Sequence, residues 1–298
     1  ARTMEKETRK AFGIPLGTLP EVVDSDAFYG NTDFAGYLPQ AIPIHAVMGD
    51  SHAALFGQGC LQPGGVKATY GTGSSVMINT GKTRIDSKKG LVTSLAWSLS
   101  GEVNYVLEGN INYTGAVISW LKDDLGIIKS ARETQEMAKA ANTADTTYLV
   151  PAFTGLGAPY WQDQAKGLIT GMTRVTGKNE LVKATLESIA YQISDILKLM
   201  ETESKIKITA LRVDGGPTKN EYLMQFQSDI QGCKVLVSDV EELSASGAAY
   251  LAGIAIGLYD NKKISFTGNH KIYSTLMDTT RRESLYLGWQ KAIARTIQ

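Results

Sequence analysis

The sequence is poor in the residues that build metal centres and disulfide frameworks. It holds two cysteines, Cys60 and Cys233, and three histidines, His45, His52 and His270, in 298 residues. The cysteines have no paired metal-ligand spacing, so no zinc site is expected, and both are interpreted as small apolar side chains. Two distant cysteines behind an N-terminus that does not resemble a signal peptide fit a reducing, cytoplasmic location.

Net charge and long apolar runs are also missing. Lys and Arg together number 30, as do Asp and Glu, so the formal net charge is zero. Because no basic stripe stands out, nucleic acid is not an expected partner. No apolar run approaches the length of a membrane span, so no membrane partner is expected either. The 43% apolar and 20% charged content is ordinary for an α/β protein of one large or two modest domains.

Strand-like patterns cluster in the first third of the chain. Short turns separate most of them, which predicts consecutive antiparallel strands. The expected strands are Ile44–Met48, Gly65–Tyr70, Val76–Asn79, Leu91–Trp97 and Val103–Leu107.

Helical periodicity dominates the remainder. The expected helices are Met4–Phe12, Tyr113–Leu125, Ala131–Asn142, Asn179–Glu203, Lys219–Gln231, Leu243–Ile256 and Glu283–Thr296. Strands at Thr209–Asp214 and Lys234–Val237 alternate with the later helices, whereas residues 150–176 read as a long irregular loop. This alternation predicts a mixed sheet with helices on its faces.

A glycine-flanked threonine joins two of the expected strands. Gly71-Thr72-Gly73 can present bare backbone N–H groups to an anion without a Walker lysine. Asp50 follows an apolar run upstream of this turn. A phosphate cradle and a carboxylate together indicate phosphoryl transfer to a hydroxyl. Two plainer interpretations stay open: the turn is an ordinary hairpin, and Asp50 caps a helix over 51–57.

A second glycine-rich turn follows the strand that ends at Asp214. Gly215 and Gly216 remove side chains where the backbone turns, and Asn220 lies at the start of the next helix. Thr218 and Glu221 have the spacing of a capping box. A helix start there offers unpaired N–H groups to an anion. The alternatives are an ordinary strand-to-helix turn and a surface role for Asn220.

Gly115 lies in the first turn of an expected helix, and Ser119 lies one turn later on the same face. Glycine at such a position costs about 1 kcal/mol relative to alanine. Either a neighbouring segment or a ligand is therefore expected to approach Gly115 closely.

Taken together, these segments resemble the FGGY carbohydrate kinases, most closely their glycerol kinase branch. The matching stretches are Gly49–Gln58, Lys67–Gly73, Leu107–Gly109 with Thr114–Ala116, Gly167–Gly171, Ala184–Tyr191 and Asp214–Pro217. The resemblance implies an α/β fold of the actin/hexokinase/Hsp70-like (ribonuclease H-like) ATPase type, a mixed sheet with helices on both faces.

Family members also carry an N-terminal half with an Asp-x-Gly-Thr-x-Ser phosphate motif, which is not found in this sequence. The resemblance therefore implies that residues 1–58 are the end of an N-terminal substrate domain and that residues 59–298 are the C-terminal nucleotide-binding domain. The expected partners include a missing N-terminal domain, and a homo-oligomer stays open. This chain by itself is expected to be weak or inactive as a kinase.

The resemblance also implies roles for individual residues. Asp50 matches the catalytic base and lies near Mg²⁺, and Ser51 lies at the acceptor. The positions that match ATP contacts are Gly71, Thr72, Gly73, Gly115, Ser119, Gly215, Gly216 and Asn220. Ser51 and Ser119 both stand where glycerol kinases carry Gln, and the first of those Gln residues contacts glycerol. The expected substrates are therefore ATP and a sugar or polyol that the sequence does not identify.

A function from another class fits the same fold. Nucleotide-binding interaction proteins of the actin and Hsp70 kind, and sugar-sensing regulatory proteins, need no carboxylate at a sugar hydroxyl. Asp50 followed by Ser-His-Ala-Ala-Leu-Phe-Gly favours the kinase.

Overall fold

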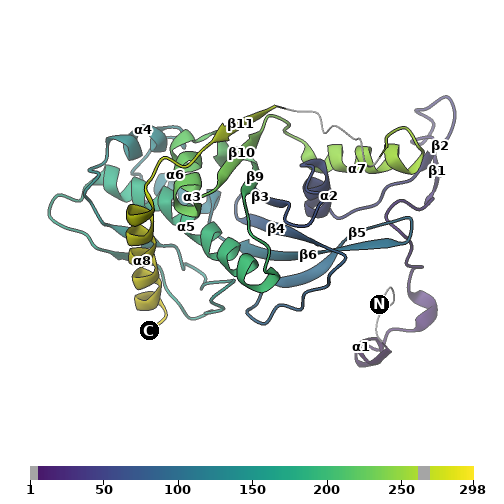
Figure 1. Cartoon of the computed structure of the whole chain (residues 1–298), viewed down its shortest axis with the longest axis horizontal. Coiled ribbons are helices and arrows are strands. Elements are labelled where there is room, and N and C mark those ends of the chain that lie inside the picture. The colour runs from purple at the N-terminus through teal and green to yellow at the C-terminus, as the bar shows by residue number, and fades with distance from the viewer. Residues whose placement is uncertain (1–5, 261–268) are drawn as a thin grey trace.

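The computed structural model describes residues 6–260 and 269–298, and a seven-stranded sheet lies at its centre (Figure 1). The strands are β1 (Gly30–Thr32), β2 (Ile42–Ile44), β3 (Val66–Tyr70), β4 (Ser74–Gly81), β5 (Val92–Leu99), β6 (Glu102–Ile111), β7 (Tyr148–Val150), β8 (Leu168–Thr170), β9 (Ala210–Asp214), β10 (Lys234–Ser238) and β11 (His270–Tyr273). The order in the sheet is β11-β10-β9-β3-β4-β6-β5.

The sheet is mixed, as the sequence predicts. Strand β9 is parallel to both of its neighbours, β10 and β3. The pairs β3–β4, β4–β6 and β6–β5 are antiparallel, which confirms the predicted antiparallel run. Strand β5 lies at the edge and pairs with β6 rather than with β4. The pairs β1–β2 and β7–β8 form separate two-stranded sheets.

Helices cover both faces of the sheet, which confirms that part of the fold prediction. They are α1 (Lys6–Ala11), α2 (Asp50–Gly57), α3 (Gly115–Ser119), α4 (Glu133–Ala140), α5 (Lys178–Ser204), α6 (Glu221–Gln231), α7 (Leu243–Ala255) and α8 (Thr279–Thr296). Short turns are η1 (Leu16–Thr18), the π-helical η2 (Trp120–Asp124) and η3 (Gly216–Lys219). Helices α5 and α6 pack on one face, and α2 and α7 pack on the other (Figure 1).

The side chains of β3 point alternately into two different environments. Val66, Ala68 and Tyr70 belong to the large apolar core that includes α5 and α6. Lys67 and Thr69 alternate with these apolar residues and form hydrogen bonds to other polar groups. Because successive strand residues point to opposite faces, β3 places a polar pair beneath α2.

The predicted strand Ile44–Met48 is wrong beyond its first residue. Strand β2 covers Ile42–Ile44 and pairs with β1, and residues 45–49 form no strand. Ala46 and Met48 instead pack against the apolar cluster between the sheet and α2. The apolar residues of this segment are therefore explained by packing of Ala46 and Met48 rather than by pairing in a sheet.

Helix boundaries differ in smaller ways. The predicted helix Tyr113–Leu125 is an α-helical turn followed by the π-helical η2. The loop over 150–176 is mostly irregular, but it contains β8. The first predicted helix is observed as α1, while Met4 and Glu5 lie outside the described residues. In the two described ranges, no helix has the length and apolar character that crossing a membrane requires.

Candidate nucleotide-binding site

The Gly71-Thr72-Gly73 segment is the exposed turn of the β3–β4 hairpin. Tyr70 and Ser74 pair on either side of it, and the Gly71 N–H donates to the Gly73 carbonyl at 2.8 Å. The hairpin interpretation and the phosphate-loop interpretation are therefore compatible. Gly71 and Thr72 are both exposed.

The start of α3 packs directly on this turn. The Gly115 N–H donates to the Gly71 carbonyl at 2.9 Å, and the Ala116 N–H donates to the Thr72 carbonyl at 3.0 Å. A Cβ atom on Gly115 would lie 2.8 Å from the Gly71 carbonyl oxygen. A close neighbouring segment therefore accounts for the glycine in the first turn of this helix.

The second glycine-rich turn packs against the end of the same strand, β3. Gly215 has a φ of +101°, and a Cβ there would overlap the Tyr70 carbonyl oxygen. Both observations require glycine at this position. The turns after β3 and β9 are therefore neighbours, as expected for two loops that serve one ligand.

The predicted capping box is wrong. The Thr218 hydroxyl donates to the Gly215 carbonyl at 2.7 Å within η3. Helix α6 begins later, and its N-cap is Asn220, whose Oδ1 accepts from the Leu223 N–H at 3.0 Å. The capping box fails because the backbone makes a 3-10 turn before the α-helix starts.

A cavity of about 700 Å³ lies beside these turns. It collects four of the residues that the sequence analysis selected from distant segments: Gly115, Ser119, Gly216 and Asn220. Its apolar walls include Ile118, Leu186, Pro217 and Leu223. A cavity of this size with a few convergent polar groups is typical of a small-molecule or cofactor site.

The charge of this cavity has one sign. Among the described residues that line it are Lys122, Arg132 and Lys219, and none is acidic. The chain as a whole has equal numbers of acidic and basic residues. The cavity is therefore suited to an anionic ligand, because its lining carries three cationic side chains and no acidic one.

Asp50 and Ser51 lie apart from the residues that line this cavity. Asp50 is the first residue of α2 and is exposed, and its Oδ1 accepts from the Ser51 N–H at 2.6 Å. The N-cap position belongs to Gly49, so the helix-cap interpretation of Asp50 is wrong. Its carbonyl accepts from the Ser244 hydroxyl at 2.9 Å, which ties α2 to α7.

A cluster of polar side chains beneath α2 connects this helix, which carries Asp50, to both glycine turns. The Asp214 Oδ1 accepts from Gln58 Nε2, at the end of α2, and from the Thr69 hydroxyl in β3, both at 3.0 Å. Lys67 Nζ donates to the same hydroxyl at 3.0 Å. The Asp214 carboxylate, at the end of β9, thus hydrogen-bonds both to the C-terminal end of α2 and to β3.

Burial shifts the pKa values of both Asp214 and Lys67. Desolvation raises the pKa of Asp214, and the positive charge of Lys67 opposes the rise. Desolvation likewise lowers the pKa of Lys67, against the charges of Asp214, Glu108 and, more weakly, Asp50. The charge of Asp50 therefore reaches Lys67, near the start of β3.

His52 has a structural role, because it joins α2 to the sheet. Its Nε2 lies 3.1 Å from the Ser94 hydroxyl in β5. Burial lowers its pKa, and the nearby Glu108 opposes that effect. A neutral imidazole held in this way fits the structural interpretation.

The available protein ligands limit how a metal ion could bind. Within the part of the chain that the structure describes, no group of three or more His, Cys, Asp or Glu side chains could hold a metal ion. Mg²⁺ commonly uses one or two carboxylates, with phosphate oxygens and water as the other ligands. The single exposed Asp50 fits a metal of that kind.

A sequence model of the FGGY family of carbohydrate kinases, C-terminal domain, matches residues 66–256. This stretch holds both glycine turns and the cavity residues. The chain belongs to the FGGY family of carbohydrate kinases. The predicted resemblance to the FGGY kinases is thereby confirmed.

Several FGGY kinases resemble the chain over nearly its whole length. A glycerol kinase from Carboxydothermus hydrogenoformans is 47% identical over 294 residues, 98% of this chain. The structure of Plasmodium falciparum glycerol kinase with ADP superposes with a TM-score of 0.92 at 33% identity and covers 99% of this chain. A xylulose kinase from Lactobacillus acidophilus shares the fold, with a TM-score of 0.85 at 19% identity.

This FGGY chain is shorter than those relatives. It spans 59% of the Carboxydothermus protein and 60% of the Plasmodium chain. The match to these relatives shows that this chain has the actin/hexokinase type of kinase fold. The match covers only part of the relatives' own length.

Sequence reasoning missed one wall of the cavity in this FGGY domain. Ala131, Arg132, Thr134 and Gln135 line it from the start of α4. The sequence marks this segment only as part of an expected helix, and Asn220, which donates to Thr134, lies 86 residues away along the chain. No local signal could have indicated that contact.

Proposed function

We propose that this chain carries the nucleotide-binding part of an ATP-dependent carbohydrate or polyol kinase. The observation that carries the proposal is the cation-lined cavity, because it joins Gly115, Ser119, Gly216 and Asn220 beside the Gly71-Thr72-Gly73 turn. Residues 1–58 would belong with the substrate domain and residues 59–298 with the nucleotide domain. Which sugar or polyol is the acceptor is left to experiment.

Asp50 would act as the general base. Its exposed carboxylate accepts the proton of the acceptor hydroxyl as that oxygen attacks the γ-phosphorus and the bond to the leaving β-phosphate oxygen breaks. Proton transfer is late, because a carboxylate is far too weak a base to ionise an alcohol in advance. Ser51, one residue later, would contact the acceptor.

The glycine turns would supply charge stabilisation rather than covalent chemistry. Thr72 and the amide of Gly73 would donate to phosphate oxygens, where negative charge must be held during transfer, while the Gly71 N–H stays on the Gly73 carbonyl and shapes the turn. Gly215 and Gly216 let the backbone approach the nucleotide. A bound Mg²⁺ would neutralise phosphate charge, with Asp50 near it directly or through water.

Calorimetry with ATP on this chain, together with a phosphorylation screen over polyols and ketoses on the full-length gene product, tests the proposal. We expect weak ATP binding by the chain and transfer to at least one acceptor by the full-length protein. Asp50→Asn should keep nucleotide binding and lower turnover at least about 100-fold.

Each of three outcomes would contradict one part of the proposal. Near-wild-type turnover of Asp50→Asn would refute the base assignment. Robust kinase activity of this chain alone would refute the expectation that it is weak or inactive. Nucleotide binding without transfer to any acceptor would favour a nucleotide-binding interaction or sugar-sensing regulatory protein.

A further inference from the structure

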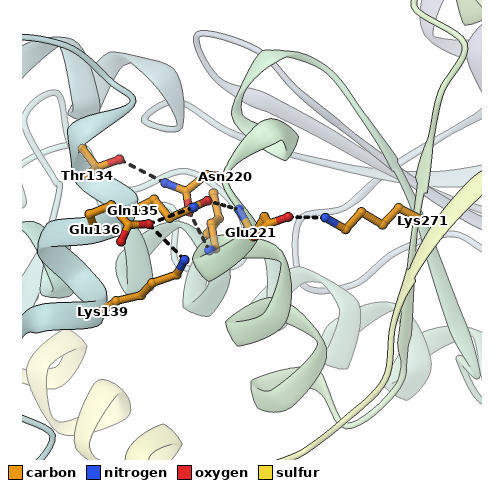
Figure 2. Close-up of polar contacts among 8 residues, drawn as sticks. Thr134, Gln135, Glu136, Lys139, Asn220, Glu221 and Lys271 are labelled. Atoms are coloured by element: carbon orange, nitrogen blue, oxygen red, sulfur yellow. Dashed lines mark hydrogen bonds and ion pairs between the residues drawn. The ribbon is translucent and has the colours of Figure 1, made fainter.

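Helix α4 forms a wall of the nucleotide cavity that none of the glycine motifs includes. Its N-cap residue Arg132 and its first-turn residues Thr134 and Gln135 all line the cavity. Figure 2 shows Thr134 and Gln135 facing the start of α6. A nucleotide in the cavity would therefore lie between α4 and the Gly216–Asn220 segment.

Two hydrogen bonds fix this wall to α6, and a third holds Asn220 on α6 itself. Asn220 Nδ2 donates to the Thr134 hydroxyl at 3.0 Å, and the Glu221 N–H donates to Gln135 Oε1 at 2.7 Å (Figure 2). Asn220 Oδ1 accepts from the Leu223 N–H. The Asn220 amide is thus held at both ends, so it sets the distance between two elements of the cavity.

Thr134 also organises the turn that carries the arginine. Its side chain is buried, and its hydroxyl donates to the Ala131 carbonyl at 2.6 Å while accepting from Asn220. Ala131 and Arg132 both line the cavity. Removing the hydroxyl would release the α6 contact and leave the turn only the longer bond from the Thr134 N–H to the same carbonyl, at 3.3 Å, because one oxygen serves both.

The three cations of the cavity differ in their partners. Lys122 forms an ion pair with Asp123 at 2.8 Å, and Lys219 lies 3.9 Å from Glu241. Within the described residues, Arg132 has no ion pair and no side-chain hydrogen bond, and it is exposed. Its guanidinium is therefore available to a ligand in the cavity without breaking an existing contact.

From these observations we propose that α4 is a nucleotide-contacting element of this domain. Arg132 presents its guanidinium to the bound nucleotide, and Thr134 and Gln135 are positioning residues that act through Asn220 and Glu221. The inference rests on the proposed function, since it takes a nucleoside di- or triphosphate as the ligand of the cavity.

Titration of the 298-residue chain with ADP tests it. Thr134→Val should weaken ADP binding roughly tenfold, and Thr134→Ser, which keeps the hydroxyl, should stay within about twofold of the wild type. Arg132→Gln should weaken binding about threefold to tenfold and reduce its salt dependence. Because Arg132 is exposed, that variant tests the proposal even if Thr134→Val unfolds.

Matched controls lie outside the cavity. The Thr202 hydroxyl donates within its own helix to the Lys198 carbonyl at 2.8 Å, so Thr202→Val should bind ADP like the wild type. The exposed Arg174 is the control for charge, as Arg174→Gln. Hydrogen exchange adds a readout that a merely structural role would not change: ADP should protect amides 133–140 in the wild type and not in Thr134→Val.

The possible failures are distinguishable. If the wild type binds ADP and both Thr134→Val and Arg132→Gln bind it equally well, with no protection of α4, the α4 proposal is overturned and the proposed function stands. If the wild type binds neither ADP nor ATP, the proposed function and the α4 proposal are both overturned.

Discussion

The Thr69 hydroxyl donates a hydrogen bond of 3.0 Å to the Asp214 carboxylate, and this contact joins the two strands that lead into the glycine turns. Thr69 lies in β3 just before the Gly71-Thr72-Gly73 turn, and Asp214 ends β9 just before Gly215. Buried Lys67 compensates the charge of Asp214. The geometry of the nucleotide site thus depends on polar contacts below it.

Asp214 and Lys67 should be energetically coupled. Asp214→Asn keeps the shape of the side chain but removes the negative charge that stabilises buried Lys67, so we expect a loss of about 1–3 kcal/mol in unfolding free energy. Lys67→Met should cost a similar amount. The double variant should cost at least about 1 kcal/mol less than the sum of the two single variants. Urea unfolding measures all three, and strict additivity would contradict the coupling.

Gly215→Ala should damage both turns. The positive φ of Gly215 and the overlap of a Cβ with the Tyr70 carbonyl each oppose the substitution. We expect a loss of more than about 2 kcal/mol in stability, together with weaker ADP binding. Thermal unfolding and ADP titration measure the two effects. An alanine variant with wild-type stability would show that the turn does not need glycine.

Asp195 should make stability depend on pH. This buried carboxylate in α5 accepts hydrogen bonds from Tyr160, Trp289 and Tyr286. Burial raises its pKa from 3.8 to about 6, so the folded state holds the proton more tightly than the unfolded state does. Its contribution to stability is therefore greatest below about pH 4 and is lost as the pH rises through about 6.

The Asp195→Asn variant isolates this effect because it lacks the titrating group. The wild-type unfolding free energy minus that of the variant should fall by roughly 2 kcal/mol between pH 4 and pH 7. Denaturant unfolding at several pH values measures the difference. A difference that is constant over this range would refute the assignment.

Gly247 should control the position of α2 and hence of Asp50. Helices α2 and α7 cross in backbone contact: a Cβ on Gly247 would overlap the Ala53 carbonyl oxygen, and one on Gly57 would overlap that of Leu243. Gly247→Ala should therefore cost about 2 kcal/mol or more in stability. If the base assignment is right, turnover of the full-length protein should fall as well.

Gly17 provides the matched control for Gly247. A Cβ there would meet no heavy atom within 4 Å, so Gly17→Ala should change stability little. Equal melting temperatures for the two variants would argue against tight packing of α2 on α7.

Some features of this protein follow from the sequence because their causes are local. The alternation in β3 and the long apolar stripe of α5 each come from the repeat of one secondary structure, so both elements are visible without neighbours. The Gly71-Thr72-Gly73 turn and Gly215 are likewise visible, since glycine marks backbone that other residues rarely adopt. The alternation of strands and helices along the chain predicts a mixed sheet with helices on its faces, and the resemblance to FGGY kinases implies that helices cover both faces.

The tertiary structure decided where these segments meet. Asn220 rather than Thr218 caps α6, because a 3-10 turn shifts the helix start, and the spacing of polar residues does not reveal that turn. The start of α4 became a wall of the cavity through a hydrogen bond between residues 86 positions apart. Local periodicity fixes which face of a helix is apolar, but the partner of each polar end depends on how distant elements pack together, and that is set by the whole core.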